Sequence, residues 1–272
     1  MIKLLTILTC LSLFSTLLNA QEPLTPRGDK YFFLGINITK VNVRDEAHSP
    51  QLYSGWSPVL RIGYERIGQA TVSRFAVSYA MGTLTPHARP KPKKQLSSAD
   101  LTGIQFHYAY YRRVNGFDTE GWNRYVGGSI CINADIRQYS LPANNLLGYQ
   151  FNTSLNGGVF IHKKLGNEAW RFNYEAFIPV ISYGIRPNYI GMPPMSSSGG
   201  NGGNSVKKGL KQGKIVTFNK LFRFYNRFSF DQQINDHRER RIAYYWDYHV
   251  NHISKPLNSI TSGLTYESLF KM

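Results

Sequence analysis

The sequence predicts an all-β protein: a single antiparallel, up-and-down transmembrane β-barrel of about ten strands, with a range of roughly eight to twelve. Three observations support this fold class. They are an export signal at the N-terminus, repeated stretches of alternating apolar and polar residues, and connections that alternate between long and short. Each observation is weak when taken alone, and their agreement carries the prediction.

The N-terminus indicates export. Lys3 supplies a positive charge, the apolar run 4–18 follows, and Leu18-Asn19-Ala20 resembles an A-x-A cleavage site. The run is too short for a comfortable membrane-spanning helix. We therefore expect residues 1–20 to be a cleaved signal peptide. Residues 21–272 then form the barrel domain, located in a bacterial outer membrane.

Cysteine and charge exclude other classes of exported protein. Cys10 lies inside the apolar run, which argues against a lipoprotein signal, and Cys131 alone cannot form an intramolecular disulfide. The formal charge of +16 would commonly suggest nucleic acid, but export argues against that partner. We expect no nucleic acid. Outer-membrane lipid and anionic lipopolysaccharide are the expected counterparts of the basic chain.

The predicted strands are long stretches rich in Tyr, Phe, Val and Ile. Many of them match or exceed the roughly 9–11 residues that a tilted strand needs to cross a bilayer. Their approximate ranges are 30–44, 57–68, 71–85, 101–114, 122–139, 149–164, 168–188, 214–232, 238–253 and 258–271.

Alternation within a strand predicts which side chains face lipid. In the stretch 214–232, four Phe residues from Phe222 to Phe230 share one face, while Arg223, Arg227 and Asp231 share the other. A soluble β-sandwich would also alternate. The polar faces here favour a lumen, because they are poor in Lys and Glu and carry charges of both signs that could pair.

Connection lengths provide a second test of the topology. With the N-terminus in the periplasm, odd connections should be long outer loops and even ones tight turns. The expected outer loops are 45–56, 86–100, 140–148, 189–213 and 254–257, and the expected turns are 69–70, 115–121, 165–167 and 233–237. We expect the loop at about 189–213 to be flexible and to use Lys207, Lys208 and Lys211 for contact with anionic sugar or a partner protein.

The polar faces also define a set of charged residues inside the barrel. A barrel of about ten strands is narrow, so these side chains are expected to fill it as paired charges. A narrow conduit and a ligand pocket are the alternatives. The predicted lumen-facing residues are Arg61, Glu65, Arg74, His107, Arg113, Asp135, Arg137, Arg171, Glu175, Arg223, Arg227, Asp231 and Asp247.

Two short patterns offer candidate catalytic residues. Asp247 and His249 lie two positions apart and therefore on one face, with Asp135 as another carboxylate near the outer rim. A His–Asp pair at the rim of ten strands is similar to the omptin-like outer-membrane proteases. Only the pair and the strand count match that family.

The second pattern is His252-Ile253-Ser254 at the end of the ninth stretch. It resembles the His-x-Ser of lipid A deacylases, which implies that His252 would activate Ser254 for ester cleavage. Lys255 replaces the Asn usual in that family. The position of the orienting acid falls near Thr261, with Glu267 further along the strand.

A broader resemblance covers about a quarter of the chain. YYWDYHVNHISKPLNSITSGLTYESLF, together with RFNYEAFIPVISYGIRPNYIG, is similar to uncharacterised outer-membrane barrels of the Bacteroidota. The resemblance implies a barrel and its location, but no activity. No cofactor is expected, because no metal-ligand spacing or nucleotide fingerprint occurs.

The expected function is that of an integral outer-membrane protein with a charge-filled lumen and basic outer loops. Such a protein would act as a binding protein or as a component of an envelope complex. A deacylase-like esterase and a narrow solute channel are the alternatives.

Overall fold

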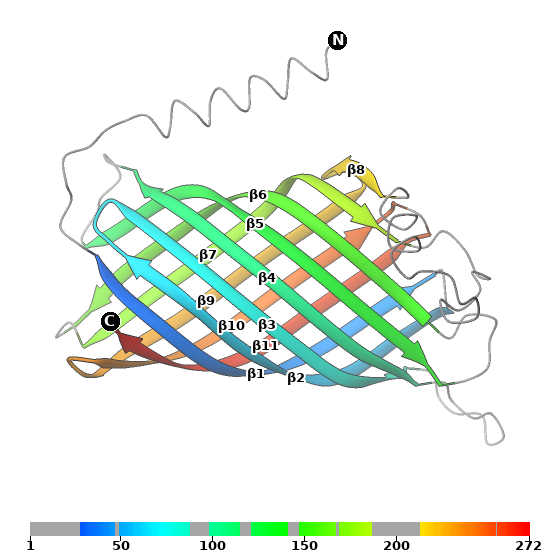
Figure 1. Ribbon diagram of the computed structural model, residues 1–272, viewed down its shortest axis with the longest axis horizontal. Helices are drawn as coiled ribbons and strands as arrows, with labels where there is room; N and C mark the ends of the chain where they lie inside the picture. The colour runs from blue at the N-terminus through cyan, green and yellow to red at the C-terminus, as the bar shows by residue number, and fades with distance from the viewer. Residues whose placement is uncertain are drawn as a thin grey trace, which may run out of the picture.

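A computed structural model describes residues 28–46, 49–87, 98–114, 121–140, 147–166, 169–186, 213–253 and 255–272. In these residues the chain forms eleven strands and no helix (Figure 1). The strands are β1 (Asp29–Asp45), β2 (Ser49–Ile67), β3 (Thr71–Pro86), β4 (Ala99–Arg113), β5 (Trp122–Tyr139), β6 (Leu147–Leu165), β7 (Trp170–Ile185), β8 (Lys214–Thr217), β9 (Leu221–Asn235), β10 (Arg238–Asn251) and β11 (Leu257–Lys271).

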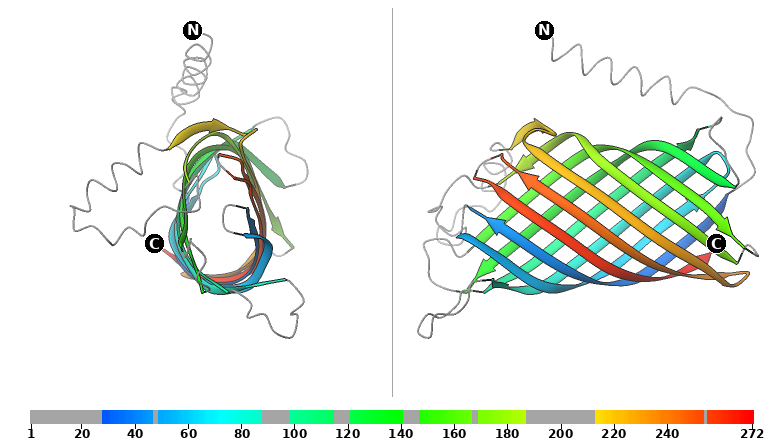
Figure 2. Two further views of the ribbon diagram at one scale, coloured as in Figure 1. Left: turned by 90° about the vertical axis from the view of Figure 1, so that its right-hand side faces the viewer. Right: turned by 180° about the vertical axis from the view of Figure 1, so that it is seen from behind.

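The strands close into a barrel. Each strand from β1 to β7 pairs antiparallel with the next, β7 pairs with β9, and β9, β10, β11 and β1 complete the circle. An end-on view shows the closed ring (Figure 2). The predicted ten-stranded antiparallel barrel is confirmed for the described residues, since β8 and β9 occupy successive parts of one position in the wall. We call the end that carries Asp29 and Lys271 the terminal end and the opposite end the loop end.

The outer surface of the barrel is apolar. On β1, Leu34, Ile36 and Ile38 point outward and are 54–58% exposed, whereas the alternate residues Phe33 and Thr39 are buried inside. The same alternation places Phe106, Ile130, Phe228, Ile242, Leu264 and Tyr266 on the outside of other strands. Closure leaves no free sheet edge, and an apolar outer belt is the surface that lipid requires. The described residues contain no helix long and apolar enough to span a membrane.

The first connection differs from the prediction. Residues 45–56 were expected to form a long loop, but β2 begins at Ser49 and pairs with Asp45, which leaves a connection of only 46–48. Tyr53 is buried and Trp56 is exposed, so the alternation continues toward the loop end. Small and polar residues between these two aromatics hide that alternation in the sequence.

The wall is irregular between β7 and β9. β7 pairs with β9 from Trp170 to Phe177 and with β8 from Ile181 to Gly184. Pro179 lies between the two ladders, and the register between β6 and β7 also shifts here. Proline lacks the backbone N–H that a ladder needs and is tolerated at such irregular positions. The short strand β8 therefore continues the wall toward the loop end.

Candidate functional site: an ion-pair plug and a lumenal pocket

Arg241 on β10 is the centre of an ion-pair cluster inside the barrel. Its guanidinium donates to Glu65 on β2 (Nη2 to Oε1, 2.7 Å), to Asp231 on β9 (Nε to Oδ1, 2.6 Å) and to Glu267 on β11 (Nη1 to Oε2, 3.3 Å). All four side chains are at most 1% exposed. A buried guanidinium needs such partners, because an unpaired charge away from water is costly.

A second arginine extends the cluster across the lumen. Arg74 on β3 donates to Glu65 (Nε to Oε2, 2.5 Å) and to Glu175 on β7 (Nη1 to Oε2, 2.5 Å). The hydroxyl of Tyr111 on β4 donates to the other oxygen of Glu175 at 2.9 Å. Arg227 bonds Glu267 at 2.7 Å. We call the whole cluster the plug: Arg61, Glu65, Arg74, Arg171, Glu175, Arg227, Asp231, Glu239, Arg241 and Glu267.

The plug lies between two cavities. The smaller, of about 130 Å³, opens at the terminal end and reaches Arg171 and Asp231. The larger, of about 210 Å³, lies toward the loop end and reaches down to Arg61 and His107. Side chains from β2, β3, β7, β9, β10 and β11 meet between them, so ion pairs cross the lumen between the two cavities.

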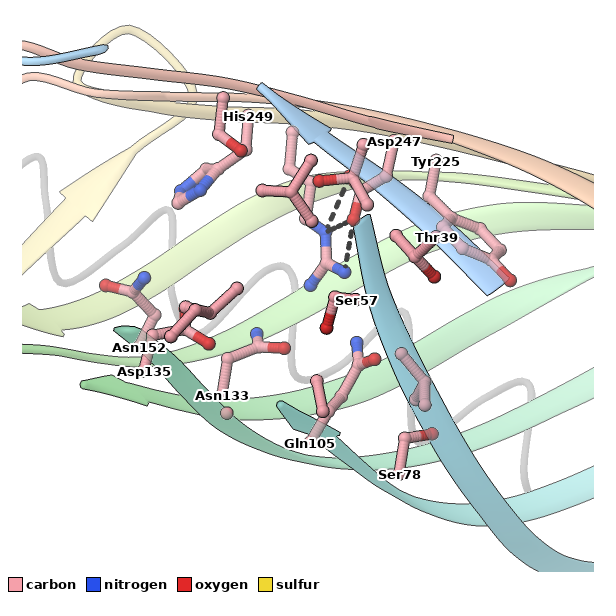
Figure 3. Close-up of a pocket in the computed structure, with 18 of the residues that line it drawn as sticks. Thr39, Ser57, Ser78, Gln105, Asn133, Asp135, Asn152, Tyr225, Asp247 and His249 are labelled. Atoms are coloured by element: carbon pink, nitrogen blue, oxygen red, sulfur yellow. Dashed lines mark hydrogen bonds and ion pairs between the residues drawn. The ribbon is translucent and has the colours of Figure 1, made fainter. Parts of the chain in front are cut away.

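We call the larger cavity the lumenal pocket. Small side chains on β2, β3 and β4 make room for it, among them Ser57, Ser78, Ala80 and Gly103. Amide side chains of β4, β5 and β6 face Thr39, Tyr225 and Asp247 across the open space; the labelled amides are Gln105, Asn133 and Asn152 (Figure 3). The pocket therefore combines neutral polar groups with apolar side chains, among them Val59, Leu101 and Leu221.

Aromatic rings form one side of the pocket. Tyr225 stacks on Phe177 with ring centroids 4.6 Å apart and on Tyr245 at 6.1 Å. His107 lies 5.2 Å from Phe177. The hydroxyls of Tyr245 and Thr39 share a hydrogen bond of 2.7 Å. The aromatic row therefore lies across the pocket from the polar amides.

Paired charges surround the pocket. Arg223 binds both carboxylate oxygens of Asp247, with Nη2 2.7 Å from Oδ2, and its Nη1 lies 3.2 Å from Cys131 Sγ. Toward the loop end, Arg186 donates to Asp45 and to the carbonyl of Lys255.

An apolar cluster lies at the same height, with Val41, Val43, Leu84 and Leu257 among its members. Burial lowers the pKa of the Arg186 guanidinium, and Asp45 opposes that effect. Arg186 and the apolar cluster together narrow the loop end of the lumen.

The predicted lumen-facing residues fall into the two parts. Those in the plug are Arg61, Glu65, Arg74, Arg171, Glu175, Arg227 and Asp231, and those lining the pocket are His107, Asp135, Arg137, Arg223 and Asp247, with Arg61 touching both. Arg113 is half-buried at the terminal end of β4.

Sequence reasoning missed Arg241, Glu267, Glu239, Asp45 and Arg186. Glu267 could have been found, because it shares the face opposite Leu264, Tyr266 and Phe270. Arg241 was hidden by the charged neighbour Arg240 on the other face.

Asp247 and His249, the first pair of candidate catalytic residues, do not form a catalytic dyad in which the carboxylate orients the imidazole. Asp247 and His249 both line the pocket, with Asp135 on its opposite side (Figure 3). Both oxygens of Asp247 bind Arg223, which makes this carboxylate part of an ion pair. Among the described residues, no group of three or more His, Cys, Asp and Glu side chains could hold a metal ion.

The His252-x-Ser254 pattern is only partly described. His252 is exposed just beyond β10, and its backbone N–H donates to the carbonyl of Lys220 at 2.7 Å. Ser254 lies outside the described residues. Thr261 lines the pocket, and Glu267 belongs to the plug. Neither Thr261 nor Glu267 therefore supplies an acid that orients His252.

Three other predictions also fall outside the described residues. They concern the signal peptide 1–20, the loop predicted at about 189–213 except for its last residue, and the loop lysines Lys207, Lys208 and Lys211.

A closed antiparallel barrel with an apolar belt and a polar lumen defines the class: this chain has the fold of an outer-membrane β-barrel protein. The outer membrane protease OmpT from Escherichia coli is similar in fold, with a TM-score of 0.51 over 93% of this chain and 99% of that one, at 6% identity.

Two further structures match with lower scores. They are Neisserial surface protein A (TM-score 0.36, 14% identity, 89% and 97% covered) and the translocator domain of autotransporter NalP from Neisseria meningitidis (0.39, 8%, 93% and 91%). No family model and no curated protein matches the chain. At these identities the likeness concerns the fold alone.

Proposed function

We propose that this chain is an outer-membrane protein that binds a ligand or an envelope partner at its loop end and does not conduct solutes. It is exported by the signal peptide 1–20 and inserted with the loop end outside the cell. The observation that best supports this proposal is the unequal arrangement of the lumen, which has a polar pocket toward the loop end and the plug on the side of the terminal end. A channel would need a continuous water-filled path, and the buried ion pairs of the plug lie across that path.

The wild-type barrel is expected to give no stepwise conductance in planar bilayers, because Arg241 and Arg74 hold carboxylates from opposite sides of the lumen. Material that shows a heat-modifiable gel band should be used, so that a silent bilayer reports a folded protein. A porin of known conductance serves as the positive control. Reproducible single-channel steps from the folded wild type would contradict the proposal and favour a narrow solute channel.

The proposal includes electrostatic attraction between the basic outer loop and lipopolysaccharide. Replacing Lys207, Lys208 and Lys211 by Gln should weaken association of the barrel with lipopolysaccharide aggregates severalfold, and added salt should reduce the difference. A matched control removes three lysines near the terminal end instead: Lys30, Lys163 and Lys271. Equal binding by the two triple variants would argue against a role for the loop.

An esterase similar to lipid A deacylases is the alternative from another class, and the local resemblance at His252 and Ser254 is what suggests it. The broader resemblance to barrels of the Bacteroidota is part of the same proposal and leaves the activity open. Altered lipid A mass spectra on expression, restored in Ser254→Ala, would favour the esterase over a binding protein.

A further inference from the structure

We propose that the lumenal pocket binds one neutral sugar unit, either a free monosaccharide or the end of a glycan chain. This inference rests on the proposed function, because it assumes that ligands reach the pocket from the loop end. Four features of the pocket carry it: unpartnered polar atoms, an aromatic side, paired charges and a small volume.

Buried polar atoms in the pocket have no partner. Asn37 Oδ1, Gln150 Nε2 and Asn152 Oδ1 form no hydrogen bond within the described part of the chain, although these residues are only 3–5% exposed. All three residues line the pocket. Nearly all buried polar atoms in proteins are hydrogen-bonded, so these atoms are expected to bond to something held in the pocket.

The chemistry of these atoms favours hydroxyl groups. Two amide oxygens need donors and one amide nitrogen needs an acceptor. Arg61 Nε and Arg137 Nε, which belong to the same lining, also lack an acceptor. A hydroxyl group both donates and accepts, so a polyhydroxylated molecule can satisfy all three amide atoms at once. Asp135, which also lines the pocket, can accept a hydrogen bond from a further hydroxyl group.

The aromatic side complements these polar groups. Phe177, Tyr225 and Tyr245 line the same space as the amides, and Tyr225 stacks against both of the other rings. A sugar ring has C–H groups on its faces and hydroxyls at its edge. The sugar ring can therefore lie with one face against the aromatic side chains while the hydroxyls at its edge reach the amides.

Charge argues for a neutral sugar. Each guanidinium that lines the pocket is already paired: Arg61 with Glu267 at 3.4 Å, Arg137 with Asp45 at 3.4 Å and Arg223 with Asp247 at 2.7 Å. Every described arginine of the lining therefore already has a carboxylate partner, which weakens its attraction for an acid sugar or a phosphate. An anionic ligand would also approach Asp135 and Asp247, and like charges repel.

Size limits the ligand to one unit. The pocket measures about 210 Å³, which is below the roughly 300–1,000 Å³ usual for drug-sized ligands. The plug closes it below, and apolar side chains such as Val41, Leu84 and Leu257 narrow it above. A longer saccharide could place only its terminal unit here.

The test is calorimetric titration of the refolded full-length mature chain in detergent micelles. The probes are glucose, galactose, mannose and N-acetylglucosamine, compared with glucuronic acid and glucosamine as charged sugars. We expect saturable binding of at least one neutral sugar and at least tenfold weaker binding of the charged sugars. A tetrasaccharide of the sugar that binds, blocked at its reducing end, then separates the two sources: binding tighter than the monosaccharide indicates a glycan end.

Two variants test the site by different means. Asn152→Leu removes a hydrogen-bonding group, and Ala80→Leu fills space while leaving the polar atoms in place. Each should weaken sugar binding at least tenfold. The control Ala134→Leu lies on the lipid side of β5 and should bind as wild type does. A heat-modifiable gel band shows that each variant has folded.

The possible results separate this inference from the proposed function. Binding of no sugar, preference for the charged sugars, or undiminished binding in both folded pocket variants would overturn the sugar assignment. A silent bilayer with no sugar binding would still leave a non-conducting binding protein. Channel conductance by the folded wild type would overturn the proposed function itself, whatever the titrations show.

Discussion

Arg241→Met is expected to lower the free energy of unfolding by about 3–5 kcal/mol, the usual cost of removing one partner from a buried ion pair. The guanidinium of Arg241 contacts Glu65, Asp231 and Glu267, and all three are at most 1% exposed. Met has a similar length and fills much of the same space. The loss would therefore come mainly from buried carboxylates that keep only their remaining partners, among them Arg74 for Glu65, Arg171 for Asp231 and Arg227 for Glu267.

Urea titration of the barrel in lipid vesicles, followed by tryptophan fluorescence and gel mobility, measures this loss. Arg240→Met is the matched control, because Arg240 is exposed on the outer side of the same strand and bonds only Gln232 among the described residues. Its stability should change by about 0.5 kcal/mol or less. Similar urea midpoints for the two variants would show that the plug does not stabilise the barrel. Adding Glu65→Gln to Arg241→Met should recover part of the loss.

Gly158→Val is expected to destabilise the barrel by about 1–3 kcal/mol or more, the range for overpacking an interior. Gly158 faces the lumen on β6, where a Cβ atom would lie 2.6 Å from the carbonyl oxygen of Ala176 and 3.0 Å from Phe177 Cβ. The carbonyl belongs to the neighbouring strand and cannot move without disturbing the ladder. The strain would act next to Phe177, which lines the lumenal pocket.

The adjacent residue provides the control. Gly157 faces lipid, and a Cβ atom there would meet only Val180 Cγ2 at an ordinary 3.7 Å. Gly157→Val should leave the urea midpoint unchanged or raise it slightly, because it adds apolar surface on the lipid side. Equal loss of stability in both variants would indicate a general effect of replacing glycine in this strand.

The barrel could be predicted from sequence because its main determinant is local. Alternation with a period of two identifies strands and also assigns each side chain to lipid or lumen, as it does for Phe228 and Arg227 on β9. The first connection was predicted wrongly, since the pairing of Asp45 with Ser49 depends on how two strands meet. The division of the wall into β8 and β9 depends likewise on the register with β7, which no local pattern encodes.

The candidate site was predictable only as a list of charges. The alternation along each strand indicates that Glu65 and Arg74 face inward. It does not indicate which residues of different strands lie at the same level along the barrel axis. The pocket exists because small residues such as Ser78 and Gly103 lie level with the amides of other strands. Their common level along the barrel axis follows from the tilt and register of the strands, so it can be seen only in the closed structure.

The pattern of ion pairs in the plug also has a consequence for the insertion of the barrel into a membrane. Arg241 takes Glu65 as a partner across 176 positions of the chain, and its other carboxylates come from the two strands beside it. An unclosed sheet that holds β10 without β2 would lack one of these ion pairs and would expose charged lumenal side chains to hydrocarbon, which is unfavourable. Strands added to the bilayer one at a time would meet that barrier repeatedly. We therefore expect the lumenal face to stay hydrated during insertion until β1 pairs with β11.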